Sequence, residues 1–430
     1  MTLKFILTAS AAAISAFMLA ACEPDGGGGD GAVSGDAGVI RSEAYCNRAG
    51  LVAPLRQTFI LIDAKVLKKA ELATDFAERN SFVRDLGLAF TNPALALASG
   101  LSDPRERISI LLVPTDGSPA QVVFTGCIPG LSPDEEAAAR AGKSGMSEFF
   151  TGDALSGMAK DAEQFQINAI GGLTAAAKRG LSAPEPQTGP IAESGLFSAI
   201  RASRGVLEPP KGTIARYVIV TDLSAASFED PASSETAHKQ GQAAGFKASG
   251  DFGLSDVMIV QPESAAPKGK DYLEGFLLAQ GGRLVSYSSG KPMAGERAPK
   301  AVRHFEGEAA YPGRSERLVL RIADDGKGNL SSSWLTLLGG VNKPIPLTGQ
   351  ISCTSPTICK VTSDDKGFAQ IWSPQPGGEP EFINELPFAG MRNFSFEIQG
   401  KELKGEASDP MVQIGNDGSK SSIAIKAGAR

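Results

Sequence analysis

The segment Thr58-Phe-Ile-Leu-Ile-Asp63 is a short apolar run that ends on an acidic residue, and a helical pattern follows it directly. Short runs rich in β-branched and aromatic residues are typical of buried strands. Over residues 65–79 the apolar side chains recur at the spacing of a helix. A strand that leads straight into a helix is the repeating unit of α/β proteins. We therefore expect Thr58–Ile62 to be the first, central strand of an α/β domain, with Asp63 at its carboxyl end.

The same alternation of strand and helix continues to about residue 290. We expect further strands at Arg107–Val113, Gln121–Phe124, Ala215–Val220, Asp256–Val260 and Arg283–Tyr287, and helices over 132–180, Glu193–Ser203 and Tyr272–Ala279. The turn cluster Thr115–Pro119 predicts that the second and third strands form a hairpin. Strands separated by helices indicate a doubly wound, mainly parallel sheet, in which functional groups gather at the carboxyl ends of the strands. Asp63 and Asp222 both occupy such positions.

Composition argues against several classes of function. The formal net charge is −6 and the sequence contains no basic run, so we expect no nucleic-acid partner. Two histidines leave little room for a histidine-based catalytic triad or metal centre. The Gly-x-Ser-x-Gly motif of serine hydrolases is absent from the sequence. We expect no catalytic residues, no cofactor and no resident metal.

Residues 1–22 have the organisation of a targeting segment. Lys4 provides a short positive region, and Phe5–Met18 is an apolar stretch that is too short and too rich in Ala and Ser for a good membrane span. The stretch closes on Leu19-Ala-Ala-Cys22, which resembles the lipobox of bacterial lipoproteins. That resemblance implies a lipidated Cys22, and Glu23 after it implies anchoring in the outer membrane. A plain secretory signal with an incidental cysteine is the alternative.

The remaining cysteines and the composition after Cys22 fit an exported protein. Residues 23–45 are expected to form a flexible, Gly-rich tether between lipid and body. Four cysteines remain, and an oxidising compartment allows three pairings among them. We favour Cys46–Cys127 and Cys353–Cys359, and free buried thiols are the alternative.

The pattern changes in the last third of the chain. We expect an α/β domain over 46–290, a polar linker over 291–300 and an all-β domain over 301–430. Short runs of alternating side chains separated by turn residues, such as Arg317–Ile322 and Asn393–Ile398, indicate a β sandwich or small barrel.

The order of the α/β elements resembles the von Willebrand factor A domain. The likeness consists of an apolar strand ending in Asp63, a strand hairpin, a helix, and a later strand followed by Asp222. In that family, an Asp-x-Ser-x-Ser loop, a Thr and a second Asp form a metal-ion-dependent adhesion site. Here Lys65 and Leu67 replace the two serines, and Ser194 is the nearest hydroxyl to the Thr position.

These replacements change the expected chemistry of the site. Mg²⁺ prefers about six oxygen ligands, and the substitutions remove two of them and add the ammonium group of Lys65. We therefore expect a metal-free site in which Lys65 pairs with Asp63 or Asp222. The alternative is that Asp63 caps the following helix and Lys65 is solvated.

Together these features predict a membrane-anchored envelope lipoprotein that binds or assembles with an unidentified envelope protein. Its binding face would include Asp63, Lys65, Ser194 and Asp222. Two alternatives remain open: an envelope hydrolase that uses Asp63 and Asp222 as working carboxylates, and a purely structural lipoprotein.

Overall fold

The structure is a computed structural model of the chain. It describes residues 38–47, 52–69, 85–140, 152–181, 189–190, 194–223, 226–227, 234–248, 250–262, 269–290, 296–311, 314–338, 344–363, 371–373, 381–384, 393–408 and 422–430. Residues Val39–Arg430 form one compact unit, in which an α/β part is followed by a β part. The targeting segment and lipobox, including Cys22, lie outside the described residues.

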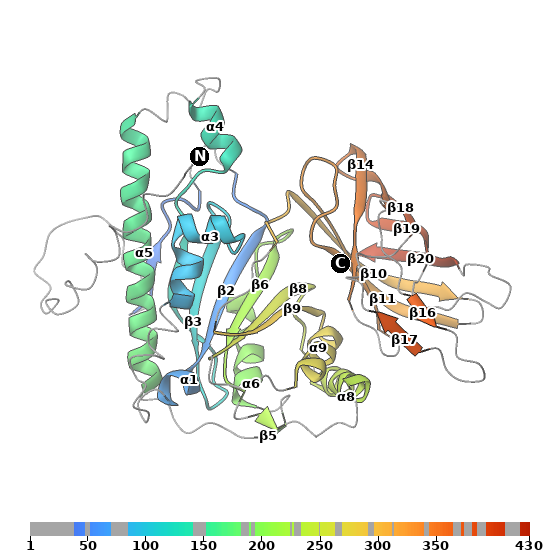
Figure 1. Cartoon of the computed structure of the whole chain (residues 1–430), viewed down its shortest axis with the longest axis horizontal. Helices are drawn as coiled ribbons and strands as arrows, with labels where there is room; N and C mark the ends of the chain where they lie inside the picture. Colours follow the sequence, from blue (N-terminus) through green and yellow to red (C-terminus); the bar gives the residue numbers. More distant parts are fainter. Residues whose placement is uncertain are drawn as a thin grey trace, which may run out of the picture. The chain divides into compact units, whose positions relative to one another are not determined.

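The α/β part is built on a mixed sheet in which β2 is central (Figure 1). The strands lie in the order β1 (Ile40–Ser42), β4 (Gln121–Cys127), β3 (Arg107–Val113), β2 (Arg56–Asp63), β6 (Ile214–Val220), β8 (Ser255–Gln261) and β9 (Gly282–Ser289). β2, β3, β6, β8 and β9 are mutually parallel, whereas β3 and β4 form an antiparallel hairpin. The expected central strand and hairpin are therefore confirmed.

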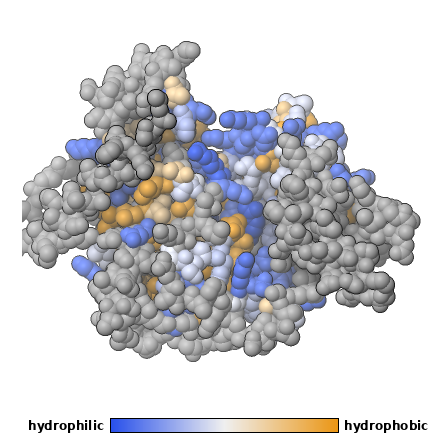
Figure 2. Space-filling model, viewed as in Figure 1, coloured by the Kyte–Doolittle hydropathy of each residue, from blue (hydrophilic) through white to orange (hydrophobic). Residues whose placement is uncertain are grey.

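Side chains on β2 alternate between two apolar cores, one on each face of the sheet. Helices therefore cover both faces. One face packs against α1 (Ala64–Lys69), residues 85–91 and the long helix α5 (Gly152–Leu181). The other face packs against α6 (Gly195–Ala202), α7 (Arg204–Leu207), α8 (Ser234–Lys247) and α9 (Lys270–Ala279). Two further helices are α3 (Pro93–Ser99) and α4 (Pro133–Arg140). Apolar side chains are visible on the surface around α3, where Leu95 is 58% exposed (Figure 2).

Several elements differ from the sequence expectation. In the segment expected to be helical over 132–180, the described residues form α4 and α5, and residues 141–151 lie outside the described ranges. Residues 85–99 and 234–247 are helical, although no helix was expected there. Ile40–Ser42 pairs in parallel with β4, so the expected tether over 23–45 overlaps a strand of the sheet.

The β part is one nine-stranded antiparallel sheet that is nearly closed on itself. Its order is β13 (Ile345–Leu347), β12 (Ser333–Leu337), β11 (Arg314–Asp324), β10 (Ala301–Tyr311), β20 (Ser422–Ala429), β19 (Glu402–Ser408), β18 (Asn393–Gln399), β15 (Ile358–Ser363) and β14 (Gly349–Ser355). The two edge strands, β13 and β14, follow each other in the chain with Thr348 between them. One apolar core fills the interior. Of the two expected architectures, the structure therefore favours the barrel-like one.

Two small sheets complete the described elements. β16 (Ile371–Ser373) pairs with β17 (Glu381–Asn384), and β5 (Gly189–Pro190) pairs with β7 (Ala226–Ser227). Within the described ranges, no helix combines the length and apolar character that crossing a bilayer requires.

Both expected disulfides are present. Cys46–Cys127 joins the segment after β1 to the end of β4, and its Cα atoms are 5.0 Å apart. Cys353–Cys359 links the neighbouring strands β14 and β15 across a tight turn.

A buried cluster of charges joins the two parts at the amino ends of β8 and β9. The Arg321 side chain on β11 is fully buried and donates to both carboxylate oxygens of Asp256 on β8, at 2.9 and 3.0 Å. Arg283 on β9 donates to the same carboxylate at 3.0 Å. Burial alone would raise the pKa of Asp256, but these two guanidinium groups hold it below its usual value. An apolar cluster of Leu254, Leu278, Val319 and Trp334 surrounds the contact.

A second buried cluster ties the expected linker to the amino ends of β2 and β6. Arg56 Nη2 lies 2.7 Å from Glu106 Oε2 and 3.0 Å from Asp103 Oδ2. Arg216 on β6 donates to the other oxygen of Glu106. Ala298, in the linker, donates its backbone N–H to Asp103 at 2.7 Å. The contacts between the two parts therefore gather at the end of the sheet opposite Asp63.

Candidate functional site

Asp63 ends β2 and caps the helix that follows. Its Oδ1 accepts a hydrogen bond of 3.0 Å from the backbone N–H of Lys65, the second residue of α1. The first N–H groups of a helix have no partner inside it, and an Asp side chain immediately before the helix satisfies one of them. The capping role that the sequence left as an alternative is therefore present in the structure.

The second carboxylate oxygen of Asp63 is held by a residue that the sequence analysis missed. Thr221 Oγ1 donates to Asp63 Oδ2 at 2.7 Å and accepts from the N–H of Leu223 at 3.1 Å. β2 and β6 are neighbours with Ile62 beside Val220, so Asp63 at the end of β2 meets Thr221, the first residue after β6. The Asp63–Thr221 bond thus joins the carboxyl end of β2, where α1 begins, to the loop after β6.

Burial dominates the electrostatics of Asp63. Its side chain is 7% exposed, and desolvation raises the pKa of its carboxyl to about 6. The hydrogen bonds from Lys65 N–H and Thr221 oppose this rise, and the nearby charge of Asp222 adds to it. The ammonium charge of Lys65 is a weaker influence than any of these. The expected neutralisation of Asp63 by Lys65 is therefore secondary to burial.

The structure divides the four expected face residues into two groups. Lys65 and Asp222 are half-buried, whereas Asp63 and Ser194 are buried. Ser194 precedes α6, where a Cβ on Gly195 would lie 2.2 Å from the carbonyl oxygen of Thr115. This close packing places Ser194 beside the β3–β4 turn. The accessible part of the candidate face is therefore Lys65 and Asp222, and the Asp63–Thr221 bond joins the segments that carry them.

Gln261 adds an unexpected polar group to the same edge of the sheet. It ends β8 and is fully buried, and within the described ranges neither polar atom of its side chain has a hydrogen-bond partner. Val220 on β6 pairs with Val260 on β8, so Thr221 and Gln261 follow adjacent paired residues. The sequence does contain a signal for Gln261, because the apolar run of β8 ends on this glutamine in the same way that the run of β2 ends on Asp63.

The position of Leu67 excludes it from the polar site. Leu67 is buried in the core between the sheet and α5, against Gly180. It therefore supplies an apolar contact where the adhesion-site pattern has a serine. Among the residues that the structure describes, no group of three or more His, Cys, Asp or Glu side chains is placed to hold a metal ion.

Comparisons with known proteins give no family for this chain. No protein-family model and no curated protein matches it. Among solved structures, it is similar to the human COPII-coat protein Sec24c, with a TM-score of 0.29 and 9% sequence identity. The match covers 90% of this chain and 45% of that one, so the chain spans less than half the length of that structure. A TM-score of this size does not indicate a shared fold.

Proposed function

We propose that this chain is a lipid-anchored envelope protein that binds another protein through the carboxyl-end face of its α/β sheet. The face comprises the first turn of α1, with Lys65, and the loop after β6, with Asp222. The hydrogen bond between Asp63 and Thr221 holds these two segments together. No metal takes part in the contact.

The observation that carries this proposal is the position of the β part. Its buried contacts, through Arg321, Asp256 and the linker residue Ala298, lie at the amino ends of the strands. Among the described residues, these contacts join the β part to one end of the α/β part, and the segments at the opposite end, with Lys65 and Asp222, supply the proposed binding surface. Rigid scaffolds that carry recognition loops at one end are common in binding proteins.

Anchoring and export are supported by separate features of the chain. Leu19-Ala-Ala-Cys22 provides the acylation motif, and two acyl chains suffice for durable membrane attachment. The disulfides Cys46–Cys127 and Cys353–Cys359 fit an oxidising compartment. Glu23 after the cysteine supports the outer membrane as the destination.

The finer fold assignment that we propose is a degenerate von Willebrand factor A-like domain. The strand order β4-β3-β2-β6-β8-β9, with β4 antiparallel to the others, supports it. The adhesion site of that family is degenerate here because Lys65 and Leu67 occupy the positions of its two serines. Leu67 is part of the apolar core.

A crosslinking pull-down from intact envelopes tests the binding proposal. The test variant is Lys65→Gln/Asp222→Asn, which removes both accessible charges of the face. The control is Glu402→Gln/Lys404→Gln, which removes an exposed ion pair on β19 of the β part. We expect a specific protein to be captured by wild type and by the control, and to be lost in the test variant. Capture that survives in the test variant would refute the proposed face.

The raised pKa of Asp63 is the one observation that favours the hydrolase alternative. A buried carboxyl that titrates near pH 6 is the kind of group that enzymes use as an acid or base. Both of its oxygens, however, are already bonded to Lys65 N–H and Thr221. Hydrolysis of isolated envelope material by wild type, abolished in Asp63→Asn and Asp222→Asn, would establish this alternative.

A further inference from the structure

A pocket of about 540 Å³ opens at the amino end of β6, away from the face described above. Its walls come from α6 and α7, from the loop 208–213 that leads into β6, and from the loop 250–253 before β8. His304 on β10 and Arg430 at the end of β20 line it from the β part. The pocket therefore lies where both parts of the unit contribute residues.

The floor of the pocket is apolar. Phe197, Leu207, Tyr217 and Phe252 line it and are each less than 10% exposed. The rings of Tyr217 and Phe252 meet edge to face, with centroids 5.5 Å apart. The hydroxyl of Tyr217 donates to the carbonyl of Leu207, so its polar atom is already satisfied. This surface suits the apolar body of a ligand.

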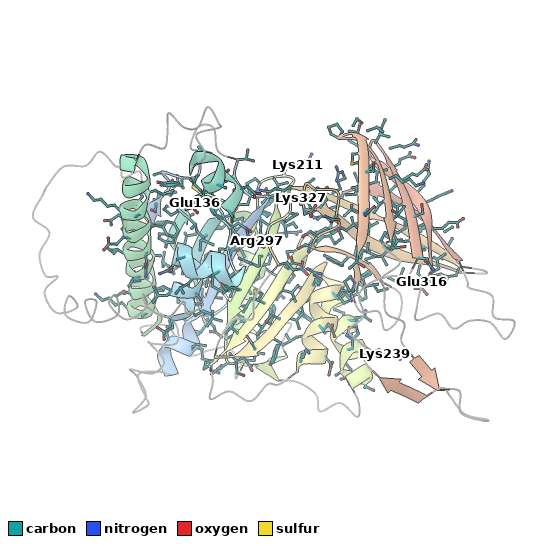
Figure 3. The ribbon with its side chains drawn as sticks, turned by 45° about the horizontal axis from the view of Figure 1, so that its top comes forward. Glu136, Lys211, Lys239, Arg297, Glu316 and Lys327 are labelled. Atoms are coloured by element: carbon teal, nitrogen blue, oxygen red, sulfur yellow. A yellow bond between two sulfur atoms is a disulfide. The ribbon has the colours of Figure 1, made fainter. Side chains whose placement is uncertain are left out.

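The rim of the pocket carries more positive than negative side chains. Arg201, Arg204, Lys211 and Arg430 line it, against Glu208 and Asp251. Asp251 is shared by two cations, because Arg204 lies 3.1 Å from its Oδ2 and Arg430 donates to the same oxygen. Lys211 is exposed on the loop between α7 and β6 (Figure 3). The excess of cations favours an anionic group at the rim.

A second observation, independent of the charges, also points to a ligand. His304 lines the pocket, and its buried Nε2 atom has no hydrogen-bond partner among the residues that the structure describes. Burial, together with the charges of Arg321 and Arg430, lowers the pKa of His304 to about 4, while Asp256 opposes the shift. His304 is therefore neutral at pH 7, and a neutral imidazole can donate one hydrogen bond to an anion.

We propose that this pocket binds a small organic phosphate, with its apolar body on the aromatic floor and its phosphate at the cationic rim. The cavity is within the usual range for small-molecule sites, roughly 300–1,000 Å³. The bound ligand contacts Arg204 and Lys211 of the α/β part and His304 and Arg430 of the β part. Occupancy therefore stabilises the junction between the two parts.

The test uses calorimetric titration of the full chain with phenyl phosphate, inorganic phosphate and phenol. We expect phenyl phosphate to bind more tightly than either fragment. Lys211→Gln and Arg204→Gln/Lys211→Gln should weaken it by about tenfold or more, as expected for lost charge-assisted hydrogen bonds. The control, Lys360→Gln, removes an exposed lysine on β15 and should leave binding unchanged. Lys211 is exposed, so its replacement leaves the fold intact.

A second readout follows His304 itself by NMR. The chain has two histidines, so the imidazole signals are few, and His304→Gln identifies the relevant one. Saturation with phenyl phosphate should raise the pKa of His304. The proposal is overturned if phenyl phosphate fails to bind, if phenol or inorganic phosphate binds equally well, or if Lys211→Gln binds like the control. A His304 signal that does not respond to bound phosphate would overturn it as well.

Discussion

At the scale of single residues, Asp63 combines a structural role with an unfavourable ionisation. Its two oxygens cap α1 through Lys65 N–H and hold Thr221, yet its side chain is 7% exposed. An ionised carboxylate in such a position loses its hydration, and the two hydrogen bonds offset only part of that loss. The folded protein therefore favours the protonated form of Asp63 more than the unfolded chain does.

This difference predicts a pH-dependent stability. The pKa of Asp63 rises from 3.8 to about 6 on folding, so the folded state binds more protons between these values. The associated stabilisation is complete below pH 3.8 and is lost as pH rises through about 6. The shift corresponds to about 3 kcal/mol.

Asp63→Asn should abolish that pH-dependent component, because an amide keeps a hydrogen-bond acceptor for Lys65 N–H and does not ionise. We expect the variant to be more stable than wild type at pH 7.5, by about 1–3 kcal/mol. Urea unfolding at pH 4.5 and pH 7.5 measures the effect. An identical pH dependence in wild type and Asp63→Asn would contradict the assignment.

Sequence could predict part of this site and not the rest. One apolar run ends on Asp63 and another precedes Asp222. The local sequence pattern is enough to place both residues at the carboxyl ends of strands. The role of Thr221 depends on the pairing of β2 with β6, which are about 150 residues apart in sequence and whose register no local pattern specifies. The burial of Ser194 likewise depends on its contact with the distant turn at Thr115.

At the scale of elements, the helices α8 and α9 pack unusually closely. A Cβ on Gly241 would lie 1.9 Å from the carbonyl oxygen of Tyr272, and one on Gly275 would lie 2.1 Å from that of His238. Glycine lowers helix propensity, so the sequence of α8 does not favour a helix by itself. The same glycines permit the contact that stabilises it, which explains why this helix was missed.

Adding a single methyl group to this contact tests its importance. Gly241→Ala should destabilise the protein by about 1–3 kcal/mol, because the close backbone contact must open. Gly157→Ala on α5 is the matched control, since its Cβ would meet no atom within 4 Å. The control should stabilise the protein by up to about 1 kcal/mol through helix propensity. Thermal unfolding measures the change in stability of each variant. If Gly241→Ala and Gly157→Ala changed the stability in the same direction, the packing argument would be refuted.

The strand β1 is another element that local pattern could not supply. It has three residues, fewer than the alternating runs that indicate a strand. Its place on the sheet is fixed by pairing with β4 and by the nearby disulfide Cys46–Cys127. The expected disulfide was therefore a better guide to this segment than its composition.

At the scale of the whole molecule, Arg321 connects the α/β and β parts. Its guanidinium donates to Asp256, to the carbonyl of Leu254 and to the carbonyl of Ser332, and it lies over the ring of Trp334. Removing one member of a buried charge cluster leaves the others unpaired. Arg321 therefore makes the unfolding of one part depend on the other.

We expect Arg321→Leu to cost about 3–5 kcal/mol and to split a single unfolding transition into two. Arg317→Leu, on the same strand, is the matched control, because Arg317 is 62% exposed in its ion pair with Glu306. Exposed pairs contribute about 1 kcal/mol or less. Scanning calorimetry measures the stability and the number of unfolding transitions of each variant. If Arg321→Leu and Arg317→Leu changed these equally, Arg321 would be ruled out as the residue that couples the two parts.

The order of an α/β part followed by a β part was accessible from sequence, whereas the closure of the β part was not. Alternation of strands and helices up to residue 290, and of short strands after it, predicts an α/β part followed by a β part. The same period-2 pattern describes a sandwich and a barrel equally well. What distinguishes them here is that β13 and β14 are consecutive in sequence yet lie at opposite edges of one sheet.

Photo-crosslinking in intact cells tests directly whether the carboxyl-end face binds a partner protein. A photoreactive amino acid would replace Asp222 on the proposed face or, as a control, Lys404, which is exposed on β19. Binding through the carboxyl-end face predicts an adduct with one specific protein from position 222 and none from position 404. An adduct from position 404 alone would place the interface on the β part and contradict the account.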